Sequence, residues 1–186
     1  MNIFYLHNYS VLENARYHCD KHVVKMVTEY CQILSTVMHK KSIDNPPYKP
    51  THVNHPCTLW ACENWYNFNW LVEQFDALCQ EYTHRYKKIH ACQKFLPIFE
   101  KASNDMPDDQ PDVLTQLPQC VDEDCKFSHY LDNRDTAIAY RLYYIKHKNH
   151  FATWKNRPVP DWYEYGLESH KSGNQKKLME AVSYGL

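Results

Sequence analysis

The stretch that decides the fold, residues 10–39, reads SVLENARYHCDKHVVKMVTEYCQILSTVMH and predicts a long amphipathic helix. Ser10 and Glu13 match a capping box, in which each side chain satisfies a free backbone N–H at the helix start. No glycine or proline interrupts the stretch, and its apolar residues recur at the spacing of one helix face. These residues are Cys19, Val23, Met26, Val27, Tyr30, Leu34, Val37 and Met38.

A second long helix is predicted from Asn54 or His55 to about Tyr86, because Pro56 suits a first helical turn. Shorter helices are expected over about 91–102 and from Asp135 to about Trp154. Between them, residues 103–134 form an acidic, proline-rich loop in which Asp108 and Asp109 contribute to the local charge. Residues 163–186 are expected to be a C-terminal tail or helix.

These elements predict one all-α domain over residues 1–186, with two long helices packed against two or three shorter ones. Met1–Leu6 is apolar, and we expect it to be an extended lead-in or a short strand. Only three glycines but fifteen tyrosines occur, which favours helices with aromatic packing over a β-rich fold.

The charge is nearly balanced, with 21 basic and 22 acidic residues, so no global basic field attracts nucleic acid. Met1–Tyr9 lacks the pattern of a signal peptide, and no apolar run approaches the ~20 residues of a membrane span. The eight cysteines lie largely inside helical patterns, where they resemble small buried hydrophobes. We therefore expect reduced thiols, no disulfide and a cytosolic protein.

One polar stripe on the first helix carries the groups needed for acid–base chemistry. His18, His22, Lys25, Glu29, Gln32 and Thr36 recur every three or four residues, with Asp20 at the border of the apolar face. The alternative is an ordinary solvated face on which Lys25 and Glu29 form an i,i+4 ion pair.

The segment 48–56, YKPTHVNHP, places Thr51, His52, Asn54 and His55 just ahead of a helix start. Free N–H groups and positive potential at that point suit a phosphate, and imidazoles could act there as acid or base. The alternative is that Asn54 or His55 simply caps the helix. We expect this segment and the polar stripe to face each other, since a chain this small has little room for two sites.

A metal site is a further alternative. His18 and His22 have the spacing of helical zinc ligands, and His52, His55 and Cys57 lie close together in sequence. However, no Cys-x-x-Cys pair occurs, and twelve histidines make accidental pairs common. We therefore assign no metal and no cofactor, and expect that folding does not require zinc.

The aromatic segment 60–70 alternates tryptophan, tyrosine and phenylalanine with asparagine. Such residues can stack on bases, but on a helix they more often form core. Glu81 and Arg85 add polar groups near the end of the same helix.

Four stretches together resemble a family of small proteins encoded by tailed bacteriophages and by large DNA viruses of algae. They are NARYHCDKHVVKM (14–26), YKPTHVNHP (48–56), EYTHRY (81–86) and AYRLYY (139–144), and the similarity extends to about Trp162. The resemblance implies a viral gene expressed in the host cytoplasm and implies no activity. Its motif positions coincide with Asp20, Lys21, Lys25, Glu29, His52, Asn54, His55, Glu81 and Arg85.

The leading prediction is a virus-encoded hydrolase or lyase that cleaves a glycosidic or phosphate bond in nucleic acid or nucleotides, at its sharpest a DNA glycosylase. The catalytic residues expected are Asp20, Lys25, Glu29, His52 and His55. The substrate-binding residues expected are Lys21, His22, Gln32, Thr51, Asn54, Glu81 and Arg85.

The nucleophile is a separate question. Some small helical DNA-repair glycosylases use an N-terminal amine. In this chain a methionine before the bulky Asn2 is normally retained, so we expect Lys25 to take that role or to bind phosphate.

Two other functions stay open. A non-enzymatic viral protein could bind a host defence or replication factor through an exposed aromatic surface. A zinc-stabilised structural protein would use the histidines and cysteines as ligands. The oligomeric state is not predicted by the sequence.

Overall fold

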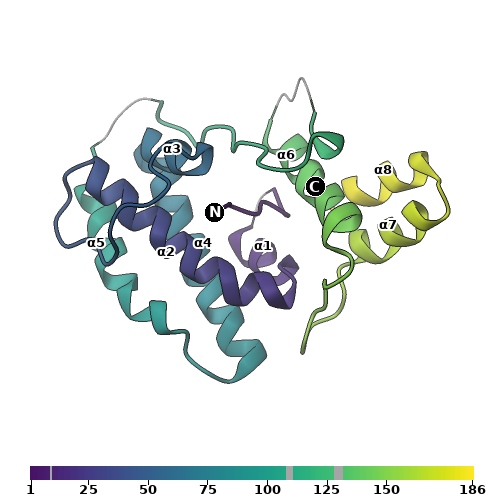
Figure 1. Ribbon diagram of the computed structural model, residues 1–186, viewed down its shortest axis with the longest axis horizontal. Coiled ribbons are helices and arrows are strands. Elements are labelled where there is room, and N and C mark those ends of the chain that lie inside the picture. Colours follow the sequence, from purple (N-terminus) through teal and green to yellow (C-terminus); the bar gives the residue numbers. More distant parts are fainter. Residues whose placement is uncertain (9, 108–110, 128–131) are drawn as a thin grey trace.

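A computed structural model describes residues 1–8, 10–107, 111–127 and 132–186; Asp108 and Asp109 of the acidic loop lie outside these ranges. Within them the chain forms eight α-helices and no strand, which confirms the all-α prediction. Helices α2–α5 lie on one side of the N-terminal segment and α6–α8 on the other, with α1 directly beside the segment (Figure 1). No helix in the described part of the chain is both long enough and apolar enough to cross a membrane.

The first predicted helix is divided into α1 (Val11–Tyr17) and α2 (Asp20–Lys40). Ser10 caps α1 as expected, since its side chain accepts a hydrogen bond from the Glu13 N–H. The break falls at His18 and Cys19, which are extended. Because the break contains neither glycine nor proline, the helical periodicity does not reveal it.

The second predicted helix is also divided, into α3 (Pro56–Glu63) and α4 (Trp65–Tyr86). His55 caps α3 and Asn64 caps α4, each through a side-chain acceptor. Asn64 also donates to the Val113 carbonyl, so its amide joins the break to a distant segment. Trp60 and Phe68 are buried, which places much of the aromatic segment 60–70 in the core.

The remaining helices are shorter. A 3-10 turn (η1, Ala91–Phe95) leads into α5 (Leu96–Asp105), and the predicted loop 103–134 contains a second such turn (η2, Glu123–Cys125). Asp132 caps α6 (Asn133–Tyr143), which continues as a π-helical turn (η3, Tyr144–Lys148) and ends before Trp154. The C-terminal region forms two helices, α7 (Asp161–Lys171) and α8 (Gln175–Ser183), which pack on each other.

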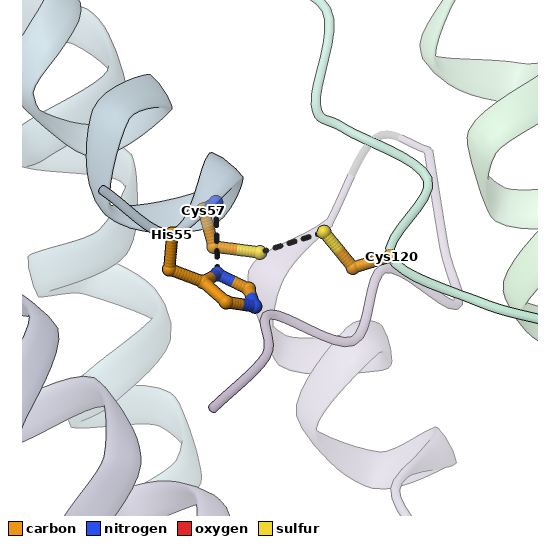
Figure 2. A group of neighbouring side chains, drawn as sticks. All are labelled: His55, Cys57 and Cys120. Carbon is orange, nitrogen blue, oxygen red and sulfur yellow. Dashed lines mark hydrogen bonds between the residues drawn. The ribbon is translucent and has the colours of Figure 1, made fainter. Parts of the chain in front are cut away.

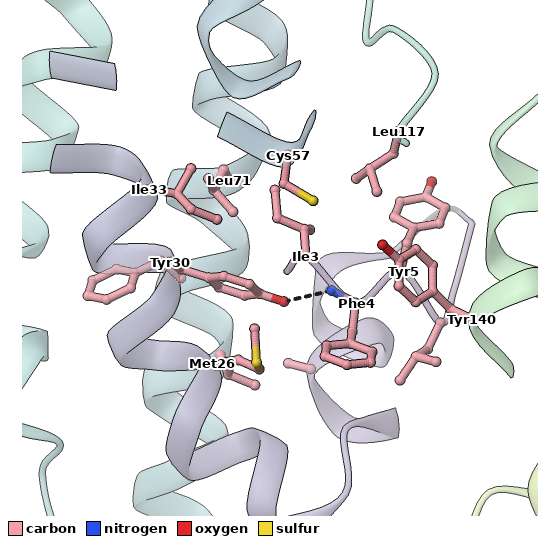
Figure 3. Close-up of a cluster of buried hydrophobic side chains, with 14 of the residues drawn as sticks. Ile3, Phe4, Tyr5, Met26, Tyr30, Ile33, Cys57, Leu71, Leu117 and Tyr140 are labelled. Atoms are coloured by element: carbon pink, nitrogen blue, oxygen red, sulfur yellow. Dashed lines mark hydrogen bonds between the residues drawn. The ribbon is translucent and has the colours of Figure 1, made fainter. Parts of the chain in front are cut away.

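Met1–Leu6 is an extended segment at the centre of the molecule, and not a strand (Figures 1 and 3). Its four residues from Ile3 to Leu6 are buried within the main core cluster. A buried extended segment leaves backbone polar groups that must be paired.

Side chains of other elements supply these partners in place of a neighbouring strand. The Phe4 N–H donates to the Tyr30 hydroxyl at 3.3 Å, and the Leu6 N–H donates to Asn14 Oδ1 at 2.6 Å. Asn14 Nδ2 returns a bond to the Phe4 carbonyl at 3.1 Å, and Arg141 Nε donates to the Leu6 carbonyl at 2.8 Å. The position of the N-terminus is therefore determined by α1, α2 and α6 together.

A second buried polar group joins the helices at the other end of α2. Arg85, 1 % exposed, donates to Asp20 Oδ1 at 2.9 Å, Glu81 Oε1 at 2.6 Å and the Arg16 carbonyl at 2.8 Å. Arg157 binds the other Glu81 oxygen at 2.8 Å. Asp20, Glu81 and Arg85, which the sequence placed among the site residues, thus connect α1, α2, α4 and the connector before α7.

We predict that Arg85→Ala lowers the free energy of unfolding by about 3–5 kcal/mol, because it removes the buried guanidinium that bonds Asp20, Glu81 and the Arg16 carbonyl. Urea denaturation followed by circular dichroism measures the change. Lys101→Ala, which removes the exposed Lys101–Asp105 ion pair, is the matched control and should leave the midpoint unchanged. Equal effects of the two substitutions would contradict a structural role for the buried group.

Candidate active site

The N-terminus and Glu29 meet at the centre of the molecule. The Met1 α-amino nitrogen lies 3.6 Å from Glu29 Oε2, and the Asn2 backbone N–H donates to the same oxygen at 2.9 Å. Lys25 Nζ lies 3.0 Å from the other oxygen, Oε1. Glu29 is only 8 % exposed, whereas the Lys25 side chain is 69 % exposed. The site therefore contains one largely buried carboxylate between two primary amines.

Asn2 is held on several sides, which fixes the backbone next to the amine. Its Oδ1 accepts a hydrogen bond from the Tyr140 hydroxyl at 2.7 Å and another from Cys57 Sγ at 3.5 Å. Its Nδ2 donates to the Cys120 carbonyl at 2.9 Å. Three elements distant in sequence thus position the N-terminal residues.

The segment 51–55 contacts α2 at its first residue. The Thr51 N–H donates to Thr36 Oγ1 at 3.1 Å, and the same hydroxyl lies 3.1 Å from the Thr51 carbonyl oxygen. His52 is exposed, has a positive φ of 47° and places its ring 6.5 Å from that of His55. Asn54 is exposed. The polar stripe and this segment are therefore neighbours at Thr36 and Thr51.

His55 combines capping with proximity to the amine. Its Nδ1 accepts a hydrogen bond from the Cys57 N–H at 3.2 Å, so it is the helix cap (Figure 2). Partial burial lowers the pKa of His55, and the positive charges of the N-terminus and of His52 lower it further, against an opposing effect of Glu29. His55 is thus close enough to the Met1 amine for the two charges to interact.

Two stripe histidines belong to the core. His18 Nδ1 donates to the Asn14 carbonyl at 2.7 Å, and its Nε2 lies 3.2 Å from the Tyr30 hydroxyl. His22 Nδ1 lies 2.5 Å from the Tyr144 hydroxyl. Burial lowers the pKa of His18 to about 4 and that of His22 to about 2. They stay neutral in the folded protein and support the core.

The predicted site residues separate into two groups. Asp20 lies nine residues before Glu29 on α2, which corresponds to about 13 Å along the helix, and it binds Arg85. Lys21 is exposed with its ammonium over the Phe151 ring, and Gln32 is half-buried. The residues gathered around the N-terminus are Lys25, Glu29 and His55, whereas Thr51 contacts Thr36 and His52 lies beside His55.

Sequence patterns gave no signal for the three contacts that position Asn2, from Cys57, Cys120 and Tyr140. Periodicity describes the faces of single helices and not contacts over 55 to 138 residues. The N-terminal amine was considered at the sequence level and set aside in favour of Lys25.

All eight cysteines are free thiols. Over the residues that the structure describes, two clusters bring three ligand-type atoms within 4.8 Å of one another: His55, Cys57 and Cys120, and Asp124, Cys125 and His147. In the second, His147 Nδ1 lies 3.1 Å from Asp122 Oδ2, and its Nε2 lies 2.8 Å from Asp124 Oδ1.

A primary amine next to a buried carboxylate can act as a nucleophile with a proton acceptor beside it, and so can form a covalent bond from its nitrogen to a substrate. The family model described as pyrimidine dimer DNA glycosylase matches residues 1–94, half of the chain, and the match contains Met1, Glu29, His55 and Cys57. The chain belongs to this family, which indicates an enzyme of the DNA glycosylase type. No curated protein and no solved structure matches the chain.

We predict that stability falls as the pH decreases from about 6.5 towards 4.5, by about 1 kcal/mol per pH unit for each buried histidine. In this range the unfolded chain takes up protons at His18 and His22 while the folded chain does not, since burial depresses the pKa of both. Urea denaturation at several pH values measures the slope. His22→Gln should remove roughly half of it, and an unchanged slope in that variant would contradict the assignment.

Proposed function

We propose that this protein excises the base of a pyrimidine dimer in DNA with the Met1 α-amine as nucleophile and Glu29 as proton carrier. The observation that carries the proposal is the 3.6 Å separation between the amine and a carboxylate that is itself largely buried. Family membership supports the substrate class.

The Met1 amine is a better candidate than Lys25 for two reasons. Model α-amino groups have a pKa near ~8 and model lysines near ~10.4, so near neutral pH the neutral, nucleophilic form is some hundredfold more abundant in an α-amine. The Lys25 side chain is also 69 % exposed, whereas that of Met1 is 2 % exposed, so the N-terminus is held more firmly beside Glu29. If Met1 is removed, the Asn2 nitrogen is already 2.9 Å from Glu29 and takes its place.

The proposed reaction balances with these two groups. Glu29 takes a proton from the α-ammonium, and the neutral nitrogen attacks C1′ of the damaged nucleotide. The C1′–N1 bond breaks, and the departing pyrimidine takes a second proton from the attacking nitrogen. The C1′–O4′ bond then opens as Glu29 returns its proton to O4′, which leaves a C1′=N iminium linkage. Water hydrolyses this linkage, and the abasic sugar is released.

Basic side chains near the amine are proposed as phosphate contacts. The pKa of His22 reflects these charges. Burial lowers it most, the charge of His18 comes next, and the positive charges of Lys148 and Lys25 lower it further. These two lysines come from η3 and α2 and therefore face the same region. Lys21 lies on the same helix as Lys25, His55 lies near the amine, and the His52 ring is 6.5 Å from that of His55. The damaged nucleotide must leave the stack to reach a buried amine.

We predict that borohydride traps a covalent adduct between this protein and ultraviolet-irradiated oligonucleotide, with the added mass on the N-terminal peptide. Glu29→Gln should slow trapping by about 10²–10⁴-fold, the range of general acid–base catalysis. Peptide mass spectrometry locates the modified nitrogen.

Two controls separate the amines. Addition of Gly-Ser before Met1 should abolish the adduct by displacing the amine, whereas Lys25→Ala should still form it. An adduct on the Lys25 peptide, lost in Lys25→Ala, would identify lysine as the nucleophile. Binding of irradiated DNA without any trapping would favour a non-enzymatic binding protein.

We predict that Lys148→Gln weakens DNA binding and makes the slope of log affinity against log salt concentration shallower by about 1, the effect of one lost phosphate contact. Fluorescence anisotropy over a salt series measures the slope. Lys101→Gln, an exposed lysine on α5, is the control and should leave it unchanged. Identical slopes for wild type and Lys148→Gln would exclude Lys148 from the interface.

A further inference from the structure

Cys57 and Cys120 form a close thiol pair beside the proposed nucleophile. Cys57 lies in the first turn of α3 and is 0 % exposed, whereas Cys120 lies in the irregular segment before η2 and is half-buried. Their sulfur atoms are 3.6 Å apart, with the Cys57 thiol as donor (Figure 2). The proposed function uses neither sulfur.

A metal is not the best occupant of this group, although His55 is near. The Nδ1 lone pair of His55 already accepts the Cys57 N–H at 3.2 Å, so the neutral ring carries its proton on Nε2. Coordination through Nε2 would move that proton to Nδ1, where it would oppose the Cys57 N–H and remove the cap of α3. Two thiols without this third ligand are an incomplete zinc site.

We propose that Cys57 and Cys120 are an oxidisable dithiol, and that closure of their disulfide by a peroxide displaces Asn2 and slows the N-terminal amine. The inference depends on the proposed function only for its effect on catalysis. The formation of the disulfide stands on the geometry of the pair.

The chemistry requires one peroxide. The Cys120 thiolate attacks a peroxide oxygen, the O–O bond breaks, and a sulfenic acid forms with release of water when the peroxide is H₂O₂. Cys57 sulfur then attacks the Cys120 sulfur, the S–O bond breaks, and a second water leaves. In sum, two thiols lose two electrons and two protons, and H₂O₂ becomes two waters.

Cys120 is suited to be the attacking thiol. The hydrogen bond from the Cys57 thiol lowers the pKa of Cys120, while the same contact and burial raise that of Cys57. Cys120 is also the more accessible of the two. A second close pair, Cys31 and Cys92, is buried at both members, so a peroxide reaches it less readily.

The coupling to the amine passes through Asn2. A disulfide needs a sulfur separation of about 2.05 Å, so the two atoms must approach by about 1.5 Å. Cys120 is in an irregular segment and can move more easily than Cys57 in a helix. Its carbonyl holds Asn2 Nδ2 at 2.9 Å, and disulfide closure removes the one Cys57 S–H proton, which lies between Cys120 Sγ at 3.6 Å and Asn2 Oδ1 at 3.5 Å. Asn2, adjacent to the nucleophile, therefore loses the Cys57 thiol as a partner and is displaced with the Cys120 carbonyl.

The test is peroxide treatment of the full-length reduced protein, followed by two independent measurements. Non-reducing peptide mapping should find one cross-link between the Cys57 and Cys120 peptides, and thiol titration should fall from eight to six. Borohydride trapping with irradiated DNA should slow by about 10- to 100-fold, since a displacement near 1 Å costs about that much. Dithiothreitol should restore it.

The variants make the test specific, each compared with its own untreated rate. In Cys120→Ser and Cys120→Ala, peroxide should neither cross-link this pair nor slow trapping. Cys125→Ser, at a buried cysteine hydrogen-bonded to Asp124, should respond as wild type does. A cross-link at Cys31–Cys92 instead, or no cross-link, overturns the oxidisable pair. A Cys57–Cys120 cross-link with unchanged trapping overturns the coupling. No trapping in the reduced protein rejects the proposed function, while the cross-link still decides the pair.

Discussion

Burial of the extended N-terminal segment is the constraint on which the rest of the structure depends. A segment without regular secondary structure can enter a core only if its backbone N–H and C=O groups find partners. Here Tyr30, Asn14 and Arg141 provide them from three different helices. Because these contacts fix residues 4–6, they also place the Met1 α-amine 3.6 Å from Glu29. The contacts that allow the N-terminal segment to be buried therefore also position the proposed nucleophile.

The polar groups of the core divide into supporting and reactive ones. Arg85, with Asp20 and Glu81, forms a closed set of ion pairs far along α2 from the N-terminus. His18 and His22 are neutral and hydrogen-bonded to tyrosines. Around Glu29, in contrast, one carboxylate serves two amines and faces a segment that carries two further histidines. Such a set has proton donors and acceptors available to a substrate, which the closed ion pairs do not.

The part of the chain beyond the family match also contributes to this site. Tyr140 and Cys120 hold Asn2, and the charge of Lys148 acts on His22. The matched residues 1–94 contain the amine and Glu29, but the residue next to the amine is held by α6 and the segment before η2. The site is thus built by the whole domain. Its thiol pair also joins these two parts of the chain.

The sequence by itself determined the all-α class and the Ser10 cap, because these follow from local periodicity and capping chemistry. It also offered Asn54 or His55 as a helix cap and proposed Lys25, Glu29, His52 and His55 as site residues. Only the tertiary structure decided that both long helices break, since Cys19 carries no local stop signal and Asn64, although a suitable N-cap, also binds the distant Val113 carbonyl. Only the tertiary structure moved Asp20, Glu81 and Arg85 into a supporting role and brought the Met1 amine to Glu29. Helical periodicity reports which face of a helix is apolar, whereas the partner of a buried polar group depends on how separate elements pack.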